Sequence, residues 1–191
     1  MEKTCVFVTG TNCTGKSTLA RALIARFGGT AECDGRITFC REGGVSLAGR
    51  YREGGRFGGV DGLRGPKGSS GTSGLAEVVE RALRRADVIF CEGSYMNTFG
   101  LNLTNAMFKA RRHLVVVLYA DASTIASRLV ARAGRLKGGF AQTLNKQRQC
   151  LVAARKWASI GVRVVMFDTA NEAVPDIVRR TLEVLGLEGA R

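Results

Sequence analysis

The sequence predicts a three-layer α/β domain in which a parallel five-stranded sheet carries helices on both faces. The chain has 191 residues, of which 45% are hydrophobic and 24% charged, as is typical of one domain spanning residues 1–191. Continuous apolar runs alternate along it with segments whose apolar residues recur every three to four positions. The runs are typical of strands covered on both faces, and the segments of amphipathic helices.

Each element can be placed from these two patterns. The strong strands are predicted at residues 5–9, 87–91, 113–119 and 162–167, with a weaker one at 30–33. The helices between and after them are predicted at residues 17–27, 75–83, 125–130 and 174–185. Strands that alternate with helices favour right-handed crossovers, and hence the parallel arrangement.

One region interrupts the alternation, because 12 of the 34 residues at positions 41–74 are glycine. Glycine and serine richness usually indicates a flexible linker, and that alternative stays open. Arginines and aromatic residues scattered among the glycines favour a functional segment instead. We predict a short hairpin over 37–41 and 45–51, followed by a mobile loop over 54–74. Together, residues 36–74 would be a Gly/Arg-rich insertion that helps to form an acceptor site.

Net charge is the outlier in the composition, since 29 Lys and Arg stand against 16 Asp and Glu, a net +13. Between Glu92 and Asp168 the only acidic residue is Asp121. The same stretch contains twelve cations, which are Lys109, Arg111, Arg112, Arg128, Arg132, Arg135, Lys137, Lys146, Arg148, Arg155, Lys156 and Arg163. This asymmetry indicates a polyanionic partner or a strong phosphate site, with a basic surface kept for solubility as the alternative.

Cysteine usage and hydropathy bear on the compartment. Six cysteines are scattered without a C-x-x-C pair, and the chain has one histidine, so neither a zinc framework nor a disulfide scaffold is predicted. The longest apolar run, residues 114–120, is far shorter than the roughly 20 residues that span a bilayer. The chain begins with a strand-like run and no signal-peptide pattern. We therefore expect a cytoplasmic protein with reduced thiols and no membrane partner.

A phosphate-binding motif lies between the first predicted strand and the first predicted helix. The pattern G-x-x-x-x-G-K-[ST] is matched in full by Gly10, Thr11, Asn12, Cys13, Thr14, Gly15, Lys16 and Ser17. Its glycines let backbone N–H groups turn inward around phosphate oxygens, and the helix N-terminus adds positive potential. We expect the site, which extends to Thr18, to bind ATP, with Lys16 on the β- and γ-phosphates and the Ser17 hydroxyl on Mg²⁺.

With this motif and its short length, the chain resembles P-loop nucleoside and nucleotide kinases over most of its sequence. After the third strong strand, residues 121–135 follow the pattern D-x₆-R-x₃-R-x₂-R, which is similar to the arginine-bearing lid of that family. The resemblance implies a lid over 121–140 whose Arg128 and Arg132 neutralise charge on the transferring phosphoryl group. A solvated basic helix face is the alternative. Residues 167–170 resemble the family's adenine-pocket segment.

A kinase needs a carboxylate that orients or deprotonates the acceptor hydroxyl, and usually one that holds Mg²⁺. Glu92 is the first candidate for both roles, because it follows the strand at 87–91, at the edge where open α/β sheets bind ligands. Asp34 follows the weak strand and is the second candidate, and Asp61 in the glycine-rich loop is the third. The choice of base among these three stays open.

Three further motifs narrow the resemblance: Gly49-Arg50-Tyr51, Gly-Gly-x-Asp at 58–61 and Glu-Gly-Ser-Tyr at 92–95. With them the chain is similar to bacteriophage P-loop kinases that phosphorylate 5-hydroxymethyluracil within DNA. The resemblance implies transfer of the ATP γ-phosphate to a base hydroxymethyl group, with DNA as partner, in the host cytoplasm. The aromatic residues available to stack on an extruded base are Tyr51, Phe57, Tyr95 and Phe99.

Two other functions stay open from the sequence. One is a kinase of free nucleosides or nucleoside monophosphates, and the other is a P-loop ATPase that binds nucleic acid. The arginine-bearing segment and the short chain argue against the ATPase. Apart from the resemblance, only the positive charge favours a DNA acceptor over a free nucleoside.

Overall fold

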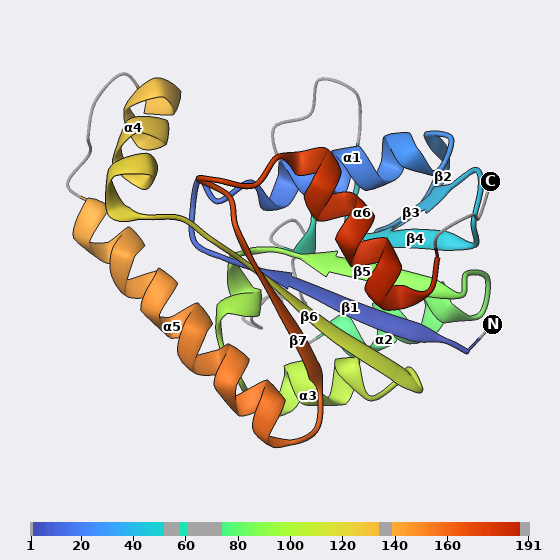
Figure 1. Cartoon of the computed structure of the whole chain (residues 1–191). Helices are drawn as coiled ribbons and strands as arrows, with labels where there is room; N and C mark the ends of the chain where they lie inside the picture. Colours follow the sequence, from blue (N-terminus) through green and yellow to red (C-terminus); the bar gives the residue numbers. More distant parts are fainter. Residues whose placement is uncertain (1, 52–57, 61–73, 134–138, 188–191) are drawn as a thin grey trace.

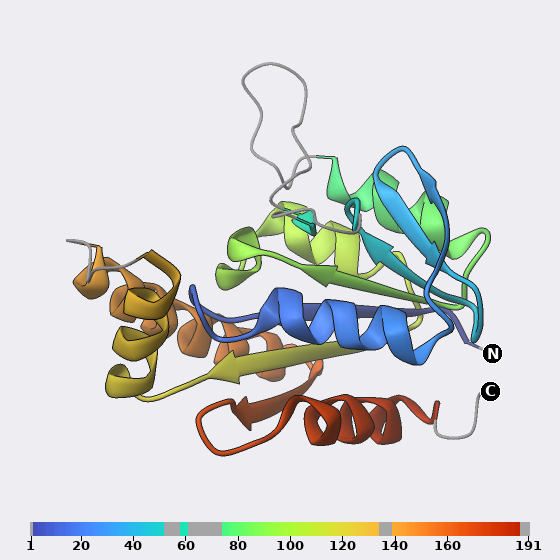
Figure 2. The same ribbon diagram turned by 90° about the horizontal axis from the view of Figure 1, so that it is seen from above.

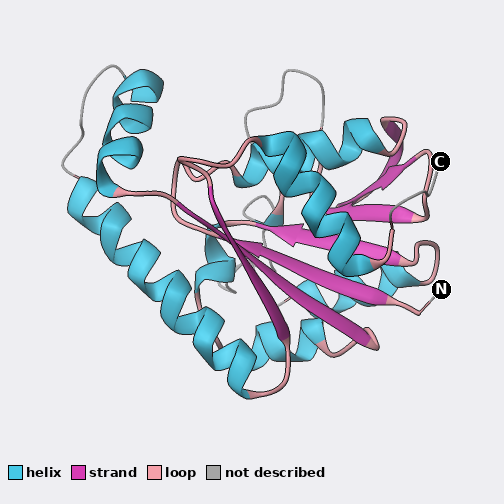
Figure 3. Ribbon diagram, in the orientation of Figure 1, coloured by secondary structure: helices cyan, strands magenta, loops and turns pink. Residues whose placement is uncertain are grey.

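The computed structural model describes residues 2–51, 58–60, 74–133 and 139–187. Its strands form a sheet in the order β2-β3-β4-β5-β1-β6-β7 (Figure 1). Their bounds are β1 (Thr4–Thr9), β2 (Thr30–Asp34), β3 (Ile37–Cys40), β4 (Val45–Ala48), β5 (Val88–Glu92), β6 (Arg112–Tyr119) and β7 (Arg163–Asp168). Strands β4, β5, β1, β6 and β7 are parallel, so their carboxyl ends meet at one edge of the sheet (Figure 3).

Helices cover both faces of this sheet, which confirms the predicted three-layer α/β fold (Figure 2). One face carries α1 (Lys16–Arg26) and α6 (Val174–Leu185). The other carries α2 (Leu75–Leu83), α3 (Leu101–Met107) and α5 (Phe140–Ser159). Helix α4 (Ala122–Ala133) lies beyond the carboxyl edge of the sheet (Figure 1).

The central strand β1 shows why both faces are filled. Val6 and Val8 pack among residues of α1 and α6, whereas Cys5 and Phe7 pack among residues of α2, α3 and α5. The ring of Phe7 meets that of Trp157 edge-on, with centroids 5.7 Å apart. Each large side chain buried in this way stabilises the fold by about 1.5–3 kcal/mol. The layered core therefore fixes β1, and with it the loop that leaves its carboxyl end.

The predicted hairpin is present as β3 and β4, which pair antiparallel, but its description as an insertion is wrong. Strand β4 also pairs in parallel with β5, so the hairpin supplies the fifth strand of the parallel sheet. All four β4 residues are buried, and the Ser46 hydroxyl donates to the Val88 carbonyl at 3.1 Å. The weak predicted strand is β2, which pairs antiparallel with β3 at the sheet edge. The loop predicted at 54–74 lies outside the described residues except at 58–60 and 74.

Two helices, α3 and α5, are absent from the sequence-based assignment. The buried stripe of α5 consists of Thr143, Cys150, Ala153, Ala154 and Trp157, which are mostly small or polar residues. Such a stripe gives little hydrophobic contrast with the solvent face, so the helical period is hard to recognise. The predicted lid at 121–140 comprises α4 and the first residue of α5, with 134–138 outside the described residues. Within the described ranges, no helix is long and apolar enough to cross a membrane.

Candidate active site

The phosphate-binding motif forms the loop between β1 and α1, as predicted. Gly10 has a φ of 153°, and a Cβ there would lie 2.5 Å from the Leu118 carbonyl oxygen, so the close packing of this loop on β6 requires glycine. Gly15 has a φ of 88° and caps α1, which begins at Lys16. Because the N–H groups at a helix start have no intrahelical partners, the start of α1 and the loop form a concavity suited to an anion.

Lys16 is folded back over the loop. Its Nζ donates to the carbonyl oxygens of Gly10 and Thr11, each at 2.8 Å. The loop is held in turn by α5, because the Thr11 hydroxyl donates to the Thr143 carbonyl at 2.7 Å. The ammonium group therefore lies beside the concavity, on a loop anchored from two sides, where a phosphate can take the place of the carbonyl contacts.

Glu92 ends β5 and lies buried beside the first turn of α1, with an exposed fraction of 3%. Its Oε1 accepts hydrogen bonds from the Tyr51 hydroxyl at 2.8 Å and from the Ser17 hydroxyl at 3.2 Å. A buried carboxylate is costly unless its oxygens have such donors. The carboxyl end of β5, the chain after β4 and the start of α1 thus converge on one carboxylate.

Three glycines allow the chain to pack directly against this carboxylate. A Cβ on Gly59 would lie 2.4 Å from the Glu92 carbonyl oxygen and 2.5 Å from its Oε1. A Cβ on Gly58 would lie 2.4 Å from the Tyr51 ring, and one on Gly49 would lie 2.3 Å from the Gly59 nitrogen. At these three positions glycine therefore has a steric cause: a larger residue at Gly59 would push against Glu92, and one at Gly49 or Gly58 would displace Gly59 or Tyr51.

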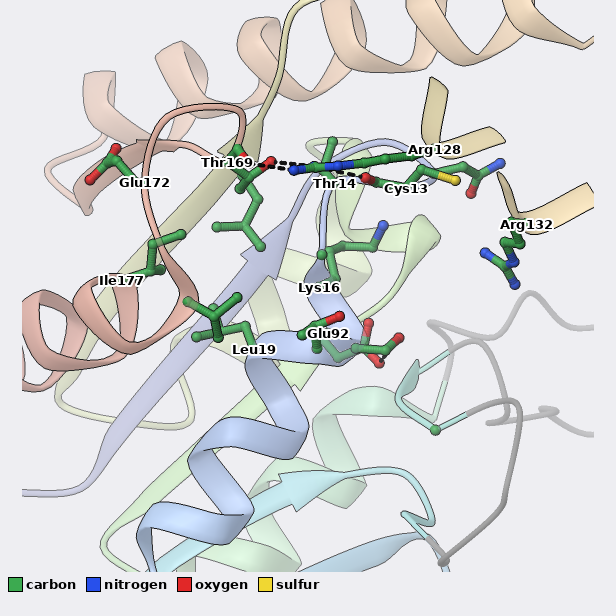
Figure 4. Close-up of a pocket in the computed structure, with 17 residues that line it drawn as sticks. Cys13, Thr14, Lys16, Leu19, Glu92, Arg128, Arg132, Thr169, Glu172 and Ile177 are labelled. Atoms are coloured by element: carbon green, nitrogen blue, oxygen red, sulfur yellow. Dashed lines mark hydrogen bonds between the residues drawn. The ribbon is translucent and has the colours of Figure 1, made fainter. Parts of the chain in front are cut away.

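Helix α4 brings Arg128 to the loop. Its guanidinium donates to the Cys13 carbonyl at 3.2 Å and to the Thr169 hydroxyl at 2.9 Å, with a further bond to the Thr169 carbonyl (Figure 4). Arg128 thus joins the phosphate loop to the segment after β7. Arg132, one turn further along, lines the same space and forms no hydrogen bond or ion pair with another described residue.

These groups line one cavity of about 480 Å³ (Figure 4). At one end, the loop with Lys16 and the two arginines present cations and hydrogen-bond donors, and Glu92 adds a carboxylate. The far end, away from Arg132, includes Leu19, Glu172 and Ile177 (Figure 4). Thr169 lies between the two parts, bonded to Arg128, and Leu118 and Val174 also line the cavity. The cavity is therefore polar and cationic where phosphates would bind and partly apolar where a flat ring would fit.

The cavity gathers most of the predicted site residues. The predicted residues that line it are Asn12, Cys13, Thr14, Gly15, Lys16, Ser17, Thr18, Glu92, Arg128 and Arg132. The carbonyl oxygens of Gly10 and Thr11 accept the hydrogen bonds of Lys16. Asp34 does not line it: this residue lies on the edge strand β2 and pairs with Arg81 and Arg85 at 3.5 and 3.8 Å. Asp61 lies outside the described residues.

Tyr51 has a different environment from the one predicted. It is 9% exposed, packs within the core and donates to Glu92, so it is not presented for stacking on a base. The hydrogen bond between Tyr51 and Glu92 can be predicted from the sequence only if β4 is placed beside β5 in the sheet. The apolar residues at the far end of the cavity also escaped the sequence analysis, because apolar residues in strands and helices carry no signal that distinguishes a cavity wall from the core. Thr169, in the predicted adenine-pocket segment, does line the cavity.

A buried thiol lies beneath the phosphate loop without contributing charge. Burial raises the pKa of the Cys150 thiol, and the hydrogen bond to Thr9 and the charge of Lys16 offset this only in part. Cys150 is therefore protonated at neutral pH, and no thiolate opposes the positive potential of the loop.

The sequence matches no protein-family model and no curated protein. Solved structures do share its fold. The YorR protein of Bacillus subtilis, in complex with phosphorylated GDP, is 18% identical, with 98% of each chain covered and a TM-score of 0.58. A gluconokinase from Sinorhizobium meliloti is 19% identical, with 97% of each chain covered and a TM-score of 0.56. Deoxyadenosine kinase from M. mycoides with bound dCTP is 13% identical over 96% of this chain and 98% of that one, with a TM-score of 0.52. The chain has the P-loop kinase fold.

Proposed function

We propose that this protein is an ATP-dependent kinase that transfers the γ-phosphate to a hydroxyl group of its acceptor. The observation that carries the proposal is the buried carboxylate of Glu92, placed within hydrogen-bond distance of Ser17 in the same cavity as Lys16. A phosphate loop alone would suit any nucleotide-binding protein. A carboxylate at that distance adds the group that an acceptor hydroxyl requires.

In the proposed reaction the acceptor oxygen attacks the γ-phosphorus of ATP, and the bond to the β,γ-bridging oxygen breaks to release ADP. The acceptor proton passes to the Glu92 carboxylate. Lys16 contacts the β- and γ-phosphates after leaving the loop carbonyls, and Arg132 contacts the transferring group from α4. Arg128 holds the loop and the segment after β7 together, so its contribution is positioning as well as charge.

The donor set also suits Mg²⁺, which prefers hard oxygen ligands and usually binds through one or two protein groups plus phosphates. Ser17 and Glu92 supply a hydroxyl and a carboxylate 3.2 Å apart, and these residues would hold the ion. When bound, Mg²⁺ neutralises the charge of the phosphate oxygens. Tyr51 keeps Glu92 turned toward Ser17, which preserves this pair in the protein itself.

The acceptor we propose is the hydroxymethyl group of 5-hydroxymethyluracil in phage DNA, with the enzyme acting in the host cytoplasm. Two observations support it: the net +11 of the stretch between Glu92 and Asp168, and the motifs at 49–51, 58–61 and 92–95. A kinase of small nucleosides does not need such a field, whereas DNA binding is dominated by it. Free nucleosides and nucleoside monophosphates are the alternative acceptors.

The test is transfer of ³²P from γ-labelled ATP to a matched panel of acceptors. The panel contains an oligonucleotide with one 5-hydroxymethyluracil, the same oligonucleotide with thymine, free 5-hydroxymethyl-2′-deoxyuridine and the nucleoside monophosphates. We expect label in the first acceptor only. Preferential labelling of a free nucleoside or monophosphate would overturn the proposal of a DNA acceptor but not the proposal of a kinase. ATP hydrolysis without transfer to any acceptor would overturn both proposals.

A further inference from the structure

A second groove, of about 470 Å³, lies between α5 and the chain that follows β5. Asn97 and Phe99 form part of one wall, and Asn145, Arg148, Gln149 and Lys156 form part of the other. The four α5 residues lie on one stripe of the helix, because their spacings are close to multiples of a helical turn. At about 1.5 Å per residue the stripe is roughly 16 Å long, so Arg148 and Lys156 can contact different phosphates of one strand.

The cations of α5 are not neutralised within the described part of the chain. Ion pairs there involve Lys3, Lys109 and the arginines of α2, of the turn after it and of α6. None of them involves Lys146, Arg148, Arg155 or Lys156. Arg148 and Lys156 thus line the groove beside its amide side chains as uncompensated charges. Such groups are the usual partners of phosphodiester oxygens.

An aromatic ring completes the chemistry of the groove. Phe99 is partly buried and stacks edge-on against Trp157, with ring centroids 4.8 Å apart. Nearby, Tyr95 is 46% exposed. Aromatic rings beside a basic stripe are the arrangement with which proteins bind single-stranded nucleic acid, because any base can stack on a ring while cations hold the backbone.

The groove is joined to the active-site cavity by short connections. Asn97 accepts a hydrogen bond at 3.1 Å from the hydroxyl of Thr9, the last residue before the phosphate loop. The 3₁₀ helix Ser94–Asn97 begins two residues after Glu92. Helix α5 supplies the Thr143 carbonyl that anchors Thr11. The end of the groove at Asn97 therefore lies close to the carboxyl edge of the sheet, where Glu92 is placed, and α5 runs from that edge toward the start of β7 (Figure 1).

We propose that this groove binds a single-stranded segment of nucleic acid, with Arg148 and Lys156 on its phosphates and Phe99 against one of its bases. The groove lies outside the catalytic cavity and delivers the neighbouring nucleotide to it. The inference rests on the proposed function for the identity of the partner, and it adds the surface on which that partner is bound.

The test is direct binding of a fluorescein-labelled strand of twenty thymidines, followed by anisotropy without ATP. Arg148→Gln with Lys156→Gln removes the two groove cations, and Lys146→Gln with Arg155→Gln is the matched control on the same helix outside the groove. We expect the groove pair to weaken binding at least tenfold and the control pair less than threefold. The log–log salt slope should become shallower by about 1.4 for the groove pair, since each contact with a single strand contributes about 0.7.

A second readout reports on the stacking contact. Trp157 is the only tryptophan of the chain and touches Phe99, so binding in the groove should change its fluorescence. That change should disappear in the groove pair and persist in the control pair. Phe99→Leu keeps an apolar side chain over Trp157 and should weaken binding about tenfold by loss of stacking, with circular dichroism as the check on folding.

The outcomes separate this inference from the proposed function. If the groove pair and the control pair weaken binding equally, or if neither weakens it, the proposed role of the groove is overturned even if the wild type phosphorylates DNA. Groove-dependent binding without phosphate transfer to any acceptor would overturn the kinase and leave the groove standing. Lys16→Ala should bind the thymidine strand like the wild type while its transfer of phosphate to the 5-hydroxymethyluracil oligonucleotide falls about 10²–10³-fold.

Discussion

Lys16 and Ser17 illustrate how the site works at the scale of single residues, because each has a protein partner that a nucleotide would replace. The Lys16 ammonium donates hydrogen bonds to two loop carbonyl oxygens, and the Ser17 hydroxyl donates one to Glu92. Intramolecular contacts of this kind keep the side chains oriented before a ligand arrives, which reduces the entropy lost on binding. The phosphate loop is thus organised by the fold itself.

Replacing Lys16 should remove phosphoryl transfer while leaving the fold intact. Lys16→Ala eliminates a cation from the anion site, and loss of one such electrostatic contact costs about 10²–10³-fold in rate. The side chain is partly exposed, so the melting temperature should change little. Label transfer and thermal melting measured on the same preparation check both parts, and a variant that keeps more than about a tenth of the wild-type rate would argue against this nucleotide site.

Gly59 offers a sharper test, because Gly161 is a matched control. Both have a positive φ, 79° and 84°, so an alanine at either position carries similar backbone strain. Only at Gly59 would the new Cβ also collide with Glu92, since no atom of the described residues packs within 4 Å of a Cβ at Gly161. Gly59→Ala should therefore slow transfer at least tenfold relative to Gly161→Ala. Equal rates in the two variants would show that the packing against Glu92 does not position it.

At the scale of elements, the sequence predicts what depends on local pattern and misses what depends on pairing. The phosphate loop, four parallel strands and α1, α2, α4 and α6 follow from motif and periodicity. The fifth parallel strand does not, because Val45–Ala48 is too short to be told from a hairpin arm until its register with β5 is known. The position of Glu92 directly after a strand is enough to propose it as a site residue. Its hydrogen bond with Tyr51 can be predicted only when the register of β4 with β5 is known. Helix α5 was missed because its buried face is made of small residues.

The stability of helix α4 should depend on Asp121, the residue before its first turn, and this dependence should change with pH. The Asp121 carboxylate accepts hydrogen bonds from the Ser123 and Thr124 hydroxyls and the Thr124 N–H, and these hold its pKa well below the usual range. A lowered carboxyl pKa stabilises the folded state above the unfolded pKa of about 3.8, and this contribution is lost as the pH falls toward the folded value.

Asp121→Ala should therefore lower the melting temperature by a few degrees at pH 7, and the difference from wild type should shrink as the pH is lowered below about 4. Asp121→Asn keeps an acceptor for the Thr124 N–H and should recover much of the loss without the pH dependence. Melting curves across this pH range check the assignment. A wild-type-to-alanine difference that stays constant down to pH 2 would mean that the carboxylate charge does not stabilise α4.

At the scale of the whole molecule, charge is divided between two regions of the described structure. Carboxylates pair with cations around β2, α2 and α6, whereas the cations of α5 have no such partners among the described residues. This division predicts opposite salt responses for two ligands. Affinity for a DNA strand should fall steeply between 50 and 200 mM NaCl, by roughly 0.7 log units per log unit of salt for each phosphate contact.

Affinity for ATP should fall much less over the same range, because the phosphate loop binds through backbone N–H groups and few side-chain charges. Titrations of both ligands at matched salt concentrations measure this contrast. If the two affinities respond equally, the basic stretch between Glu92 and Asp168 is a solvated surface, and the free-nucleoside kinase becomes the better interpretation.

The central claim, that one cavity brings a phosphate loop and a catalytic carboxylate together for phosphoryl transfer, is tested most directly with Glu92→Gln. The substitution preserves size and hydrogen bonding but removes the group that accepts the proton. ATP affinity and the single-turnover rate of ³²P transfer to the preferred acceptor should be measured on the same sample. We predict an ATP affinity within a few-fold of wild type and a transfer rate lower by about 10²–10⁴-fold. A transfer rate within threefold of wild type would contradict the claim.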